Sequence, residues 1–291
     1  MGILSLPNEL LLIIAQDLRL KDLYHFLSTC HHLSSLLTPR LHKLALQGVG
    51  ALTALQWAAR YGHVSLAELV LSKGYGGVRG LGSGKQRLLR LTALHMAAER
   101  NHADVIRVLV KHGERVTART LGLNTPLHMA ASQGSVHAIR VLLELGADLM
   151  AVRNKRGKTP GHIAAVQGHL ESMKAFVDAG FDFYLEDHMG RTVLHEAVLN
   201  RKGVIVEFLL GHGAEKIINA RDSTGQTPLH LAVFGSTADE EIVRLLCHHG
   251  ADTEVADNLG NTPAGLAIDH CGFPLTIMLL ECIPGKSGMH L

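Results

Sequence analysis

Aromatic side chains are scarce in this sequence: tryptophan, tyrosine and phenylalanine make up 4% of its 291 residues, with a single tryptophan. Each buried aromatic side chain covers a large apolar area, so one deep core is usually rich in such residues. Small and aliphatic residues are abundant instead, and the chain contains 30 glycines. This composition argues against one large enzyme-like core and favours many thin layers packed in series.

Cysteine and net charge are also low. The four cysteines form no Cys-x-x-Cys pair and have no regular spacing, since they are Cys30, Cys247, Cys271 and Cys282. This usage is typical of a reduced, intracellular protein. The formal net charge of +2 gives no overall attraction to nucleic acid or to a membrane surface.

Long hydrophobic runs are missing as well. The apolar run from Leu10 to Ala15 follows Glu9, has no basic leader, and is too short for a signal-peptide core or a bilayer span. An N-myristoylation motif fails because position 6 is Leu6 rather than Ser or Thr. We therefore predict a cytosolic or nuclear protein.

A motif of the type Thr-Pro-Leu-His-x-Ala-Ala recurs along most of the chain. It is clearest from Thr125, Thr159 and Thr227, and looser copies begin at Thr53, Thr92, Thr192 and Thr262. Successive copies begin 39, 33, 34, 33, 35 and 35 residues apart. A fixed period of this length indicates a repeat architecture, which must be recognised before any other feature is interpreted.

Each copy has the signals of two short helices and a turn. Proline in the first helical position loses no needed hydrogen bond, and a glycine such as Gly134 closes the first helix. A second helix follows with apolar spacing, for example at Val141 and Leu142, and also ends at a glycine. A short polar stretch with Asp or Asn and Gly then supplies a turn. One such unit cannot bury its own apolar face, but stacked neighbours can, so the sequence predicts a mainly α solenoid.

The period and motif resemble the ankyrin-repeat family, with about seven copies in a predicted domain at residues 50–285. Between the first two copies, the Gly-rich stretch 74–90 contains an insertion of about six residues relative to the period of 33. In that stretch, Gly80 to Lys85 looks like a phosphate-binding loop, but its register is wrong and Gln86 stands where Ser or Thr should bind magnesium. We interpret it as a flexible insertion.

The N-terminal segment, residues 1–45, lacks the repeat. It opens with Leu6-Pro7-Asn8-Glu9-Leu10-Leu11, followed by spaced Ile14, Leu18, Asp22-Leu23 and Cys30. This pattern resembles the F-box, a small three-helix module, although it departs at His32-Leu33, where many F-boxes have a tryptophan. The resemblance implies a Skp-family adaptor as partner and implies the following contact residues: Leu6, Pro7, Glu9, Leu10, Leu11, Ile14, Leu18 and Leu23.

The residue pattern independently favours a partner for this segment. Residues 10–14 are apolar on every side, which is unusual for an unpartnered surface helix. Some forty residues are also at the lower limit of independent folding. Both features fit a segment that packs on one face and binds a protein on the other. The alternative is that it only caps the N-terminal end of the solenoid.

The 20 histidines raise the question of a metal site. His95, His128, His162, His195 and His230 recur with the motif, and in ankyrin proteins this histidine is a structural hydrogen-bonding residue. The clusters Cys30-His31-His32 and Cys247-His248-His249 consist of adjacent residues, whose side chains point in different directions on a helix and rarely close on one zinc ion. We predict no metal, no cofactor and no catalytic residues, because no nucleophile–base or paired-carboxylate arrangement has a supporting context.

Ankyrin proteins generally bind targets through the turn tips before Thr and the exposed ends of the first helices. Tyr61 and Phe234 are then plausible aromatic anchors. Residues 223 and 226 also lie at a tip. The predicted target-binding residues are Arg60, Tyr61, Glu99, Arg100, Ser132, Gln133, Lys155, Arg156, Lys158, Val166, Gln167, His188, Met189, Arg191, Leu199, Asn200 and Phe234.

Basic residues gather near the middle tips, at Arg153, Lys155, Arg156, Lys158 and Arg191. Together they could form a strip that prefers an acidic or phosphorylated target. The alternative is ordinary solvated charge with no role in recognition. The sequence leaves both open.

The two resemblances together imply a substrate receptor of a cullin–RING ubiquitin ligase, most familiar from eukaryotes. The F-box-like segment would bind a Skp-family adaptor, and through it a cullin scaffold, while the repeats would hold an unknown target protein. We expect a monomer within that complex. The alternatives are a non-ligase ankyrin scaffold and, more remotely, a small hydrolase or nucleotide-dependent enzyme.

Overall fold

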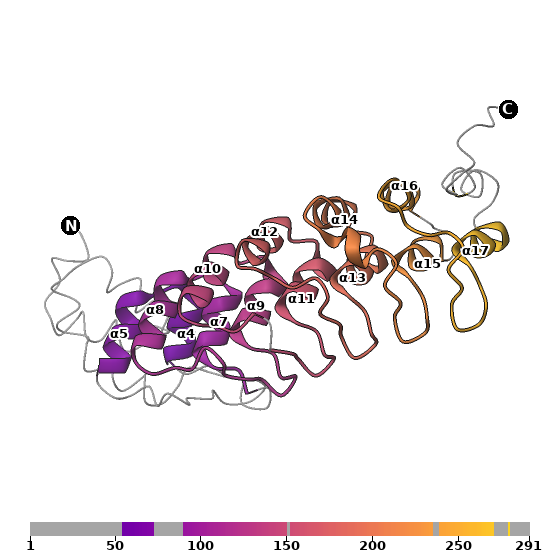
Figure 1. Ribbon diagram of the computed structural model, residues 1–291. Coiled ribbons are helices and arrows are strands. Elements are labelled where there is room, and N and C mark those ends of the chain that lie inside the picture. Colours follow the sequence, from indigo (N-terminus) through magenta and orange to yellow (C-terminus); the bar gives the residue numbers. More distant parts are fainter. Residues whose placement is uncertain (1–53, 73–89, 150–151, 235–238, 271–278, 280–291) are drawn as a thin grey trace, which may run out of the picture.

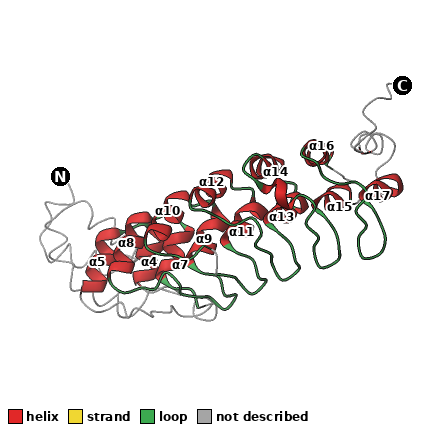
Figure 2. Cartoon of the chain, viewed as in Figure 1, coloured by secondary structure: helices red, strands yellow, loops and turns green. Residues whose placement is uncertain are grey.

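The computed structural model describes residues 54–72, 90–149, 152–234, 239–270 and 279. Within these ranges the chain forms helices and turns and no β-strand, so the predicted mainly helical solenoid is confirmed (Figure 2). The F-box-like segment and most of the Gly-rich insertion lie outside the described residues.

The repeats stack side by side in two rows of helices along an elongated, gently curved body (Figure 1). We number them 1 to 7 from the motifs at Thr53 to Thr262. The first helices of the repeats are α4 (Ala54–Tyr61), α7 (Ala93–Glu99), α9 (Pro126–Gln133), α11 (Pro160–Gln167), α13 (Val193–Leu199), α15 (Pro228–Val233) and α17 (Pro263–His270). The second helices are α5 (Val64–Ser72), α8 (Ala103–Lys111), α10 (Val136–Glu144), α12 (Leu170–Asp178), α14 (Gly203–Leu210) and α16 (Glu240–His248). A short 3-10 turn, η2 (Ala214–Ile217), follows α14, and irregular hairpins project from the first-helix side.

The motif residues set the start and the end of the first helices. Thr125 is the extended N-cap of α9, and the His128 side chain returns to the Thr125 backbone in a capping box. Gly134 ends this helix at φ 71°, in the left-handed region where glycine has no steric penalty. In repeats 2 and 5 the same place is taken by Asn101 (φ 62°) and Arg201 (φ 55°). The turn geometry is therefore kept even where its usual residue is missing.

The hairpins are built around a single side-chain acceptor. Asp187 Oδ1 accepts hydrogen bonds from the backbone N–H groups of Met189 and Arg191, at 2.8 and 3.1 Å. Asn154, Asp222 and Asp257 do the same in their repeats. Burial acts to raise the pKa of Asp222, but hydrogen bonds from Thr224 and Gln226 outweigh it and lower that pKa. These bonds hold each hairpin in a defined turn conformation.

Neighbouring hairpins are joined by one backbone hydrogen bond each. Lys155 N–H donates to Gly122 O at 2.9 Å, and His188 N–H donates to Arg156 O at 3.1 Å. Equivalent bonds continue from Ser223 to Met189 and from Asn258 to Thr224. The hairpins therefore form one continuous edge from repeat 3 to repeat 7.

The motif histidines are structural hydrogen-bonding residues, as the resemblance implies, and the structure shows that they join each repeat to the next. The Thr159 backbone N–H donates to Nδ1 of His162, so Nε2 carries the hydrogen and donates to Arg191 O at 3.1 Å. His95, His128, His195 and His230 do the same toward Asn124 O, Lys158 O, Gln226 O and Asn261 O. In repeat 1 Gln56 replaces the histidine and donates to Leu91 O at 2.8 Å. We call these six bonds the interface ladder.

A second set of contacts runs in the opposite direction along the stack. His102 Nε2 lies 3.2 Å from Arg60 O, and His169 Nε2 lies 3.2 Å from Ser132 O. Ser135 Oγ donates to Glu99 O at 3.1 Å. Each of these side chains satisfies a carbonyl near the end of the previous repeat's first helix, which would otherwise lack an intrahelical partner.

The core is thin and continuous, and only one aromatic side chain, Phe176, is among the largest fully buried residues of the described part. Repeat 4 departs from the usual packing. Gly161 replaces the motif leucine, and a Cβ atom there would lie 2.4 Å from the Phe181 ring. In repeat 3 the two corresponding positions hold Leu127 and Ala147. The large ring of Phe181 therefore fills the volume that the missing leucine leaves.

Stability should fall as the pH is lowered below neutrality. Burial lowers the pKa of His95, His128 and His162 to about 4, and also lowers that of His195 and His230, whereas in the unfolded chain these groups titrate near 6.5. Their contribution is complete above pH 6.5 and is lost as the pH falls toward 4. Each fully buried histidine should cost about 1 kcal/mol between pH 7 and 5.5.

One buried group acts in the opposite direction. Burial raises the pKa of Glu114 to about 7, against hydrogen bonds from Leu94 N–H and the Thr92 side chain, so its protonation adds stability on acidification. With five histidines against this one carboxyl, urea-unfolding midpoints should decrease from pH 7.5 to 5.5. His162→Gln, the residue type that repeat 1 uses, should flatten the decrease. A midpoint that stays constant or rises with acidification would contradict this account.

The Gly161–Phe181 pair should be strongly coupled. Gly161→Leu alone should overpack the layer and cost about 1–3 kcal/mol. Phe181→Ala alone should leave a cavity and cost about 3–5 kcal/mol. The double variant restores the residue pair of repeat 3 and should be more stable than the sum of the single effects by at least about 1 kcal/mol. Urea-unfolding midpoints of the four proteins test this, and additive effects would show that the ring does not replace the leucine.

Candidate target-binding groove

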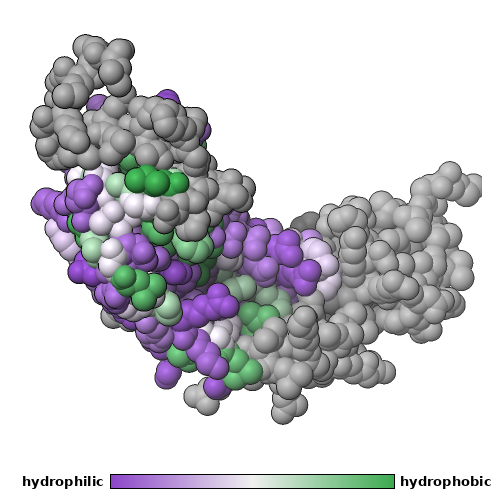
Figure 3. All heavy atoms as spheres, turned by 90° about the vertical axis from the view of Figure 1, so that its right-hand side faces the viewer, coloured by the Kyte–Doolittle hydropathy of each residue, from purple (hydrophilic) through white to green (hydrophobic). Residues whose placement is uncertain are grey.

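The hairpins and the C-terminal ends of the first helices together form one face of the stack, which we call the inner face. Its side chains come from the position seven residues after each motif threonine, as at Ser132, Val166, Leu199 and Phe234. Figure 3, turned toward the C-terminal end of the stack, shows apolar side chains in separate patches among hydrophilic ones. Two pockets lie on the inner face.

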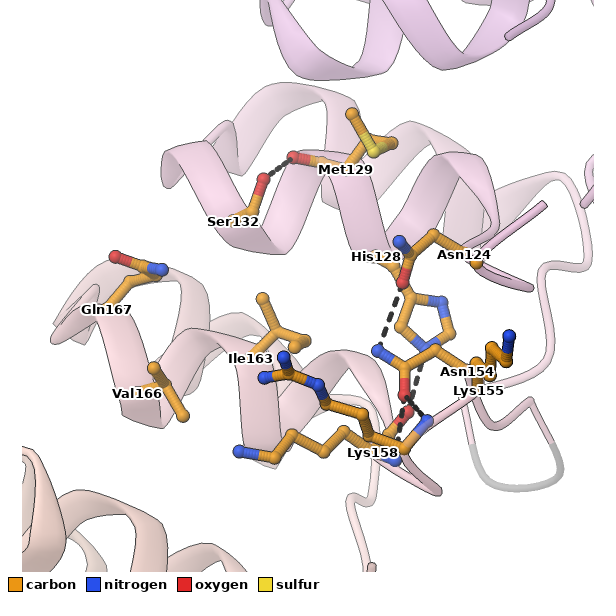
Figure 4. Close-up of a pocket in the computed structure, with 12 residues that line it drawn as sticks. Asn124, His128, Met129, Ser132, Asn154, Lys155, Lys158, Ile163, Val166 and Gln167 are labelled. Carbon is orange, nitrogen blue, oxygen red and sulfur yellow. Dashed lines mark hydrogen bonds between the residues drawn. The ribbon is translucent and has the colours of Figure 1, made fainter. Parts of the chain in front are cut away.

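The first, the repeat-3/4 pocket, lies between α9, α11 and the hairpins that precede them, and has a volume of about 480 Å³. In Figure 4, Ile163 and Val166 lie on the helix side, while Asn154, Lys155 and Lys158 lie on the hairpin side. Its lining is Gly122, Asn124, His128, Met129, Ser132, Asn154, Lys155, Arg156, Lys158, Ile163, Val166 and Gln167.

The second, the repeat-5/6 pocket, lies at α13, α15 and the start of α16 and has a volume of about 310 Å³. It is more apolar at its rim, because Leu199 is 42% exposed and Phe234 is 63% exposed. Its lining is Arg191, Val198, Leu199, Arg201, Gln226, Leu231, Ala232, Phe234, Asp239 and Ile242.

All 17 residues that the sequence predicts for target binding are at least partly exposed. The more exposed ones are Tyr61, Arg100, Gln133, Lys155, Arg156, Gln167, His188, Met189, Leu199 and Phe234. The partly exposed ones are Arg60, Glu99, Ser132, Lys158, Val166, Arg191 and Asn200. Six of the 17 line the repeat-3/4 pocket and three line the repeat-5/6 pocket, while the other eight, Tyr61 included, line neither.

The predicted basic strip separates into paired and unpaired cations. Lys158 Nζ lies 2.7 Å from Glu196 Oε2, and Arg191 Nε lies 3.5 Å from Asp222 Oδ2. Arg153 donates to the backbone carbonyls of Gly157 and Glu186. These three cations are therefore satisfied within the fold, which neither the basic-strip interpretation nor the alternative of solvated charge anticipated.

Lys155 and Arg156 are different. Both are exposed, and neither side chain has a hydrogen-bond or ion-pair partner among the described residues. They lie on the hairpin of repeat 4 at the rim of the pocket. Of the five cations in the predicted strip, these two are therefore the ones available to a target.

The motif histidines cannot act as general bases or metal ligands in this arrangement. Both nitrogens of His128 are occupied, Nδ1 by Thr125 and Nε2 by Lys158 O at 2.9 Å. In the part of the chain that is described, no three His, Cys, Asp or Glu side chains come close enough to hold a metal ion. No helix there is both long and apolar enough to cross a bilayer.

Sequence reasoning missed the pocket floor. Met129, Ile163 and Leu231 occupy the fourth position after the motif threonine and line the pockets. Their recurrence at one motif position was a usable signal. Glu196 breaks this apolar series, is 1% exposed, and forms the ion pair with Lys158. That partner is 38 positions earlier in the chain, so the sequence alone gave no sign of it.

The family comparisons match the region in which the repeat helices are seen. A model of ankyrin repeats in three copies matches residues 55–152 and 150–222, and a single ankyrin repeat matches residues 224–258. These models describe an interaction module and indicate no catalytic family.

Curated relatives share this region. The putative ankyrin repeat protein FPV031 of Fowlpox virus (strain NVSL) is 31% identical over 203 residues, which is 68% of this chain and 49% of that protein. NF-kappa-B inhibitor alpha of Rattus norvegicus is 32% identical over 98 residues, 33% of this chain and 31% of that one. The chain thus spans half or less of the length of these relatives.

Solved structures agree with the fold. The ankyrin repeat domain of Bcl-3, a member of the IkappaB family, superposes with a TM-score of 0.67 at 26% identity, covering 78% of this chain and 98% of that domain. The ankyrin repeat domain of human ASB11 gives 0.66 at 25% identity, covering 79% and 97%. With family models matching more than half of its residues, the chain belongs to the ankyrin-repeat family and carries a protein–protein interaction domain.

Proposed function

We propose that this chain is the substrate-recognition subunit of an SCF-type cullin–RING ubiquitin ligase. In this proposal the N-terminal segment binds a Skp-family adaptor, which connects it to a cullin scaffold, and the inner face of the repeats holds the target protein. The reaction belongs to the partners, so this chain needs no catalytic residue. The complex acts in the cytosol or nucleus.

The observation that carries the proposal is the Leu6-Pro7-Asn8-Glu9-Leu10-Leu11 opening placed directly before a repeat stack. About ten residues separate His42 from the first motif at Thr53, which leaves little free linker. A target held on the inner face would then lie at a fairly fixed distance from the adaptor, as transfer of ubiquitin to a bound target requires.

A non-ligase scaffold is the second candidate. The family matches that favour it begin at residue 55 and therefore cover the repeats alone. The matched relatives include proteins named as an inhibitor and as a phosphatase regulatory subunit. Under this alternative the N-terminal segment caps the stack or makes another contact. The two candidates differ in adaptor binding and agree on target binding.

Leu6→Ala combined with Pro7→Ala should reduce co-purification of a Skp-family adaptor at least about tenfold, since truncating central interface residues commonly costs more than 1.4 kcal/mol. Pro39→Ala with Leu41→Ala is the matched control, because this proline and leucine lie in the same segment but are not among the predicted adaptor contacts, and it should retain the adaptor. Helical circular dichroism of each full-length chain checks folding. Failure of the wild-type chain to retain the adaptor would favour the scaffold.

Target binding should depend on the inner face. Phe234→Asp should remove a set of captured cellular proteins from the wild-type profile, because it places a charge on the exposed apolar rim of the repeat-5/6 pocket. Val204→Asp on α14 is matched in exposure, 62% against 63%, but lies in the second-helix row. Quantitative mass spectrometry of tagged chains compares the two. Loss of the same proteins in both variants, or in neither, would argue against recognition by the inner face.

A further inference from the structure

No acidic residue lines the repeat-3/4 pocket, and its hairpin side carries hydrogen-bond donors and cations. The two hairpins that border it, 120–124 and 154–158, contain no Asp or Glu. The next three hairpins each begin with a carboxylate, at Asp187, Asp222 and Asp257. Repeat 4 uses the neutral Asn154 for the same structural task. Among the five hairpins of repeats 3 to 7, the two at this pocket are therefore the ones that carry no negative charge.

Hydrogen bonds within the pocket fix which groups remain available. Asn154 Oδ1 accepts from Arg156 N–H and Lys158 N–H, at 2.9 and 3.1 Å, so its Nδ2 must point outward. That Nδ2 donates to Asn124 Oδ1 at 3.1 Å. Asn124 consequently keeps its own Nδ2 hydrogens for a ligand, because no described residue accepts them. The orientation of both amides follows from the two backbone donors.

The other polar groups are already occupied. His128 is bonded at both nitrogens, and Ser132 Oγ donates to Met129 O at 2.8 Å. Lys158 is held by Glu196, whose side chain is 1% exposed. The available donors are then Asn124 Nδ2, Gln167 and the two unpaired cations, Lys155 and Arg156. A pocket with these groups recognises hydrogen-bond acceptors with negative charge.

The opposite side of the pocket is apolar. Met129, Ile163 and Val166 are partly exposed there and come from α9 and α11. A free inorganic ion would leave this surface uncovered. A peptide that carries an anionic side chain beside an apolar one would cover both sides, which is the arrangement that a protein target supplies.

We propose that the repeat-3/4 pocket receives a phosphorylated serine or threonine of the target protein. The phosphate is bound by Lys155 and Arg156 with the Asn124 amide, and an adjacent apolar side chain of the target packs on Ile163 and Val166. A phosphomonoester carries a charge of about −1.5 to −2 and three acceptor oxygens, which matches two unpaired cations and an additional donor. A carboxylate carries a single charge and would leave one cation unmatched.

This inference rests on the proposed function, since it specifies what the inner face recognises. Under it, target binding is conditional on a kinase. The ligand is released from this pocket when a phosphatase removes the phosphate.

The test uses the full chain, immobilised, and three degenerate peptide libraries that are identical except for a central phosphoserine, serine or glutamate. The phosphoserine library should be retained at least about tenfold better than the other two, since charge-assisted hydrogen bonds of about 1.5–3 kcal/mol are available only to it in full number. Lys155→Ala with Arg156→Ala should abolish the difference. Lys111→Ala with Arg140→Ala removes the same charge from exposed sites in the second-helix row and should leave it unchanged.

Asn154→Asp provides a second variant that is expected to fold, because Asp performs this task in repeats 5 to 7. It should weaken phosphoserine retention by placing a carboxylate beside the phosphate. Equal retention of the serine or glutamate library, or equal losses in both double variants, would overturn the proposal. Retention of a single-stranded oligonucleotide that depends on Lys155 and Arg156, without preference among the peptides, would overturn it in favour of a general polyanion site.

Adaptor co-purification and Phe234-dependent capture can be measured on the same preparations. Adaptor co-purification does not involve Lys155 or Arg156, and Phe234-dependent capture is measured with both of these residues intact. If both persist while phosphoserine selectivity is absent, this inference fails and the proposed function stands. If adaptor co-purification and Phe234-dependent capture are both absent, the proposed function fails, whatever the result with the phosphoserine library.

Discussion

The stack depends on a neutral imidazole at each repeat interface. The motif threonine donates its backbone N–H to Nδ1, which leaves the hydrogen on Nε2 and directs it to a carbonyl of the next hairpin. One side chain thus caps its own helix and sets the position of the following repeat. A protonated imidazole would have no lone pair for the threonine N–H, so helix start and repeat spacing would be disturbed together. Burial maintains the neutral form because it disfavours the charge.

The fold could be predicted largely from the sequence because its determinants are local and repeat. Thr-Pro starts, glycine ends and Asp-x-x-Gly hairpins each have a short-range physical cause, and seven copies reveal the period. Positions where a different residue type keeps the hydrogen bond or the backbone conformation of the repeat were harder to predict. Gln56 performs the work of the histidine in repeat 1, and Leu123 adopts the left-handed conformation, φ 59°, that Gly157 has in the next hairpin. The Gly161–Phe181 exchange joins positions 20 residues apart, so no local sequence pattern indicates it.

The target-binding surface was predictable in its location but not in its chemistry. Register alone places Val166, Leu199 and Phe234 on the inner face. Charge pairing does not follow from register, because Glu196 and Asp222 reach their cations from the next repeat. What resembled a uniform basic strip is therefore two unpaired residues, Lys155 and Arg156, beside three that the fold itself uses. The two pockets differ accordingly: the repeat-3/4 pocket is rich in hydrogen-bond donors, and the repeat-5/6 pocket is apolar at its rim.

These contacts join neighbouring repeats, so the repeat interfaces are arranged in series along the stack. A pull on the two ends would pass through every interface in turn, and the compliance of the whole would be the sum of the individual compliances. Two sets of hydrogen bonds resist the sliding of one repeat past the next. One is the hairpin edge, with one backbone bond between neighbouring hairpins, and the other is the interface ladder. Bending that opens the inner face would stretch the hairpin edge first. The curvature of the groove, and hence its fit to a partner, is thus a mechanical property distributed over all the repeats.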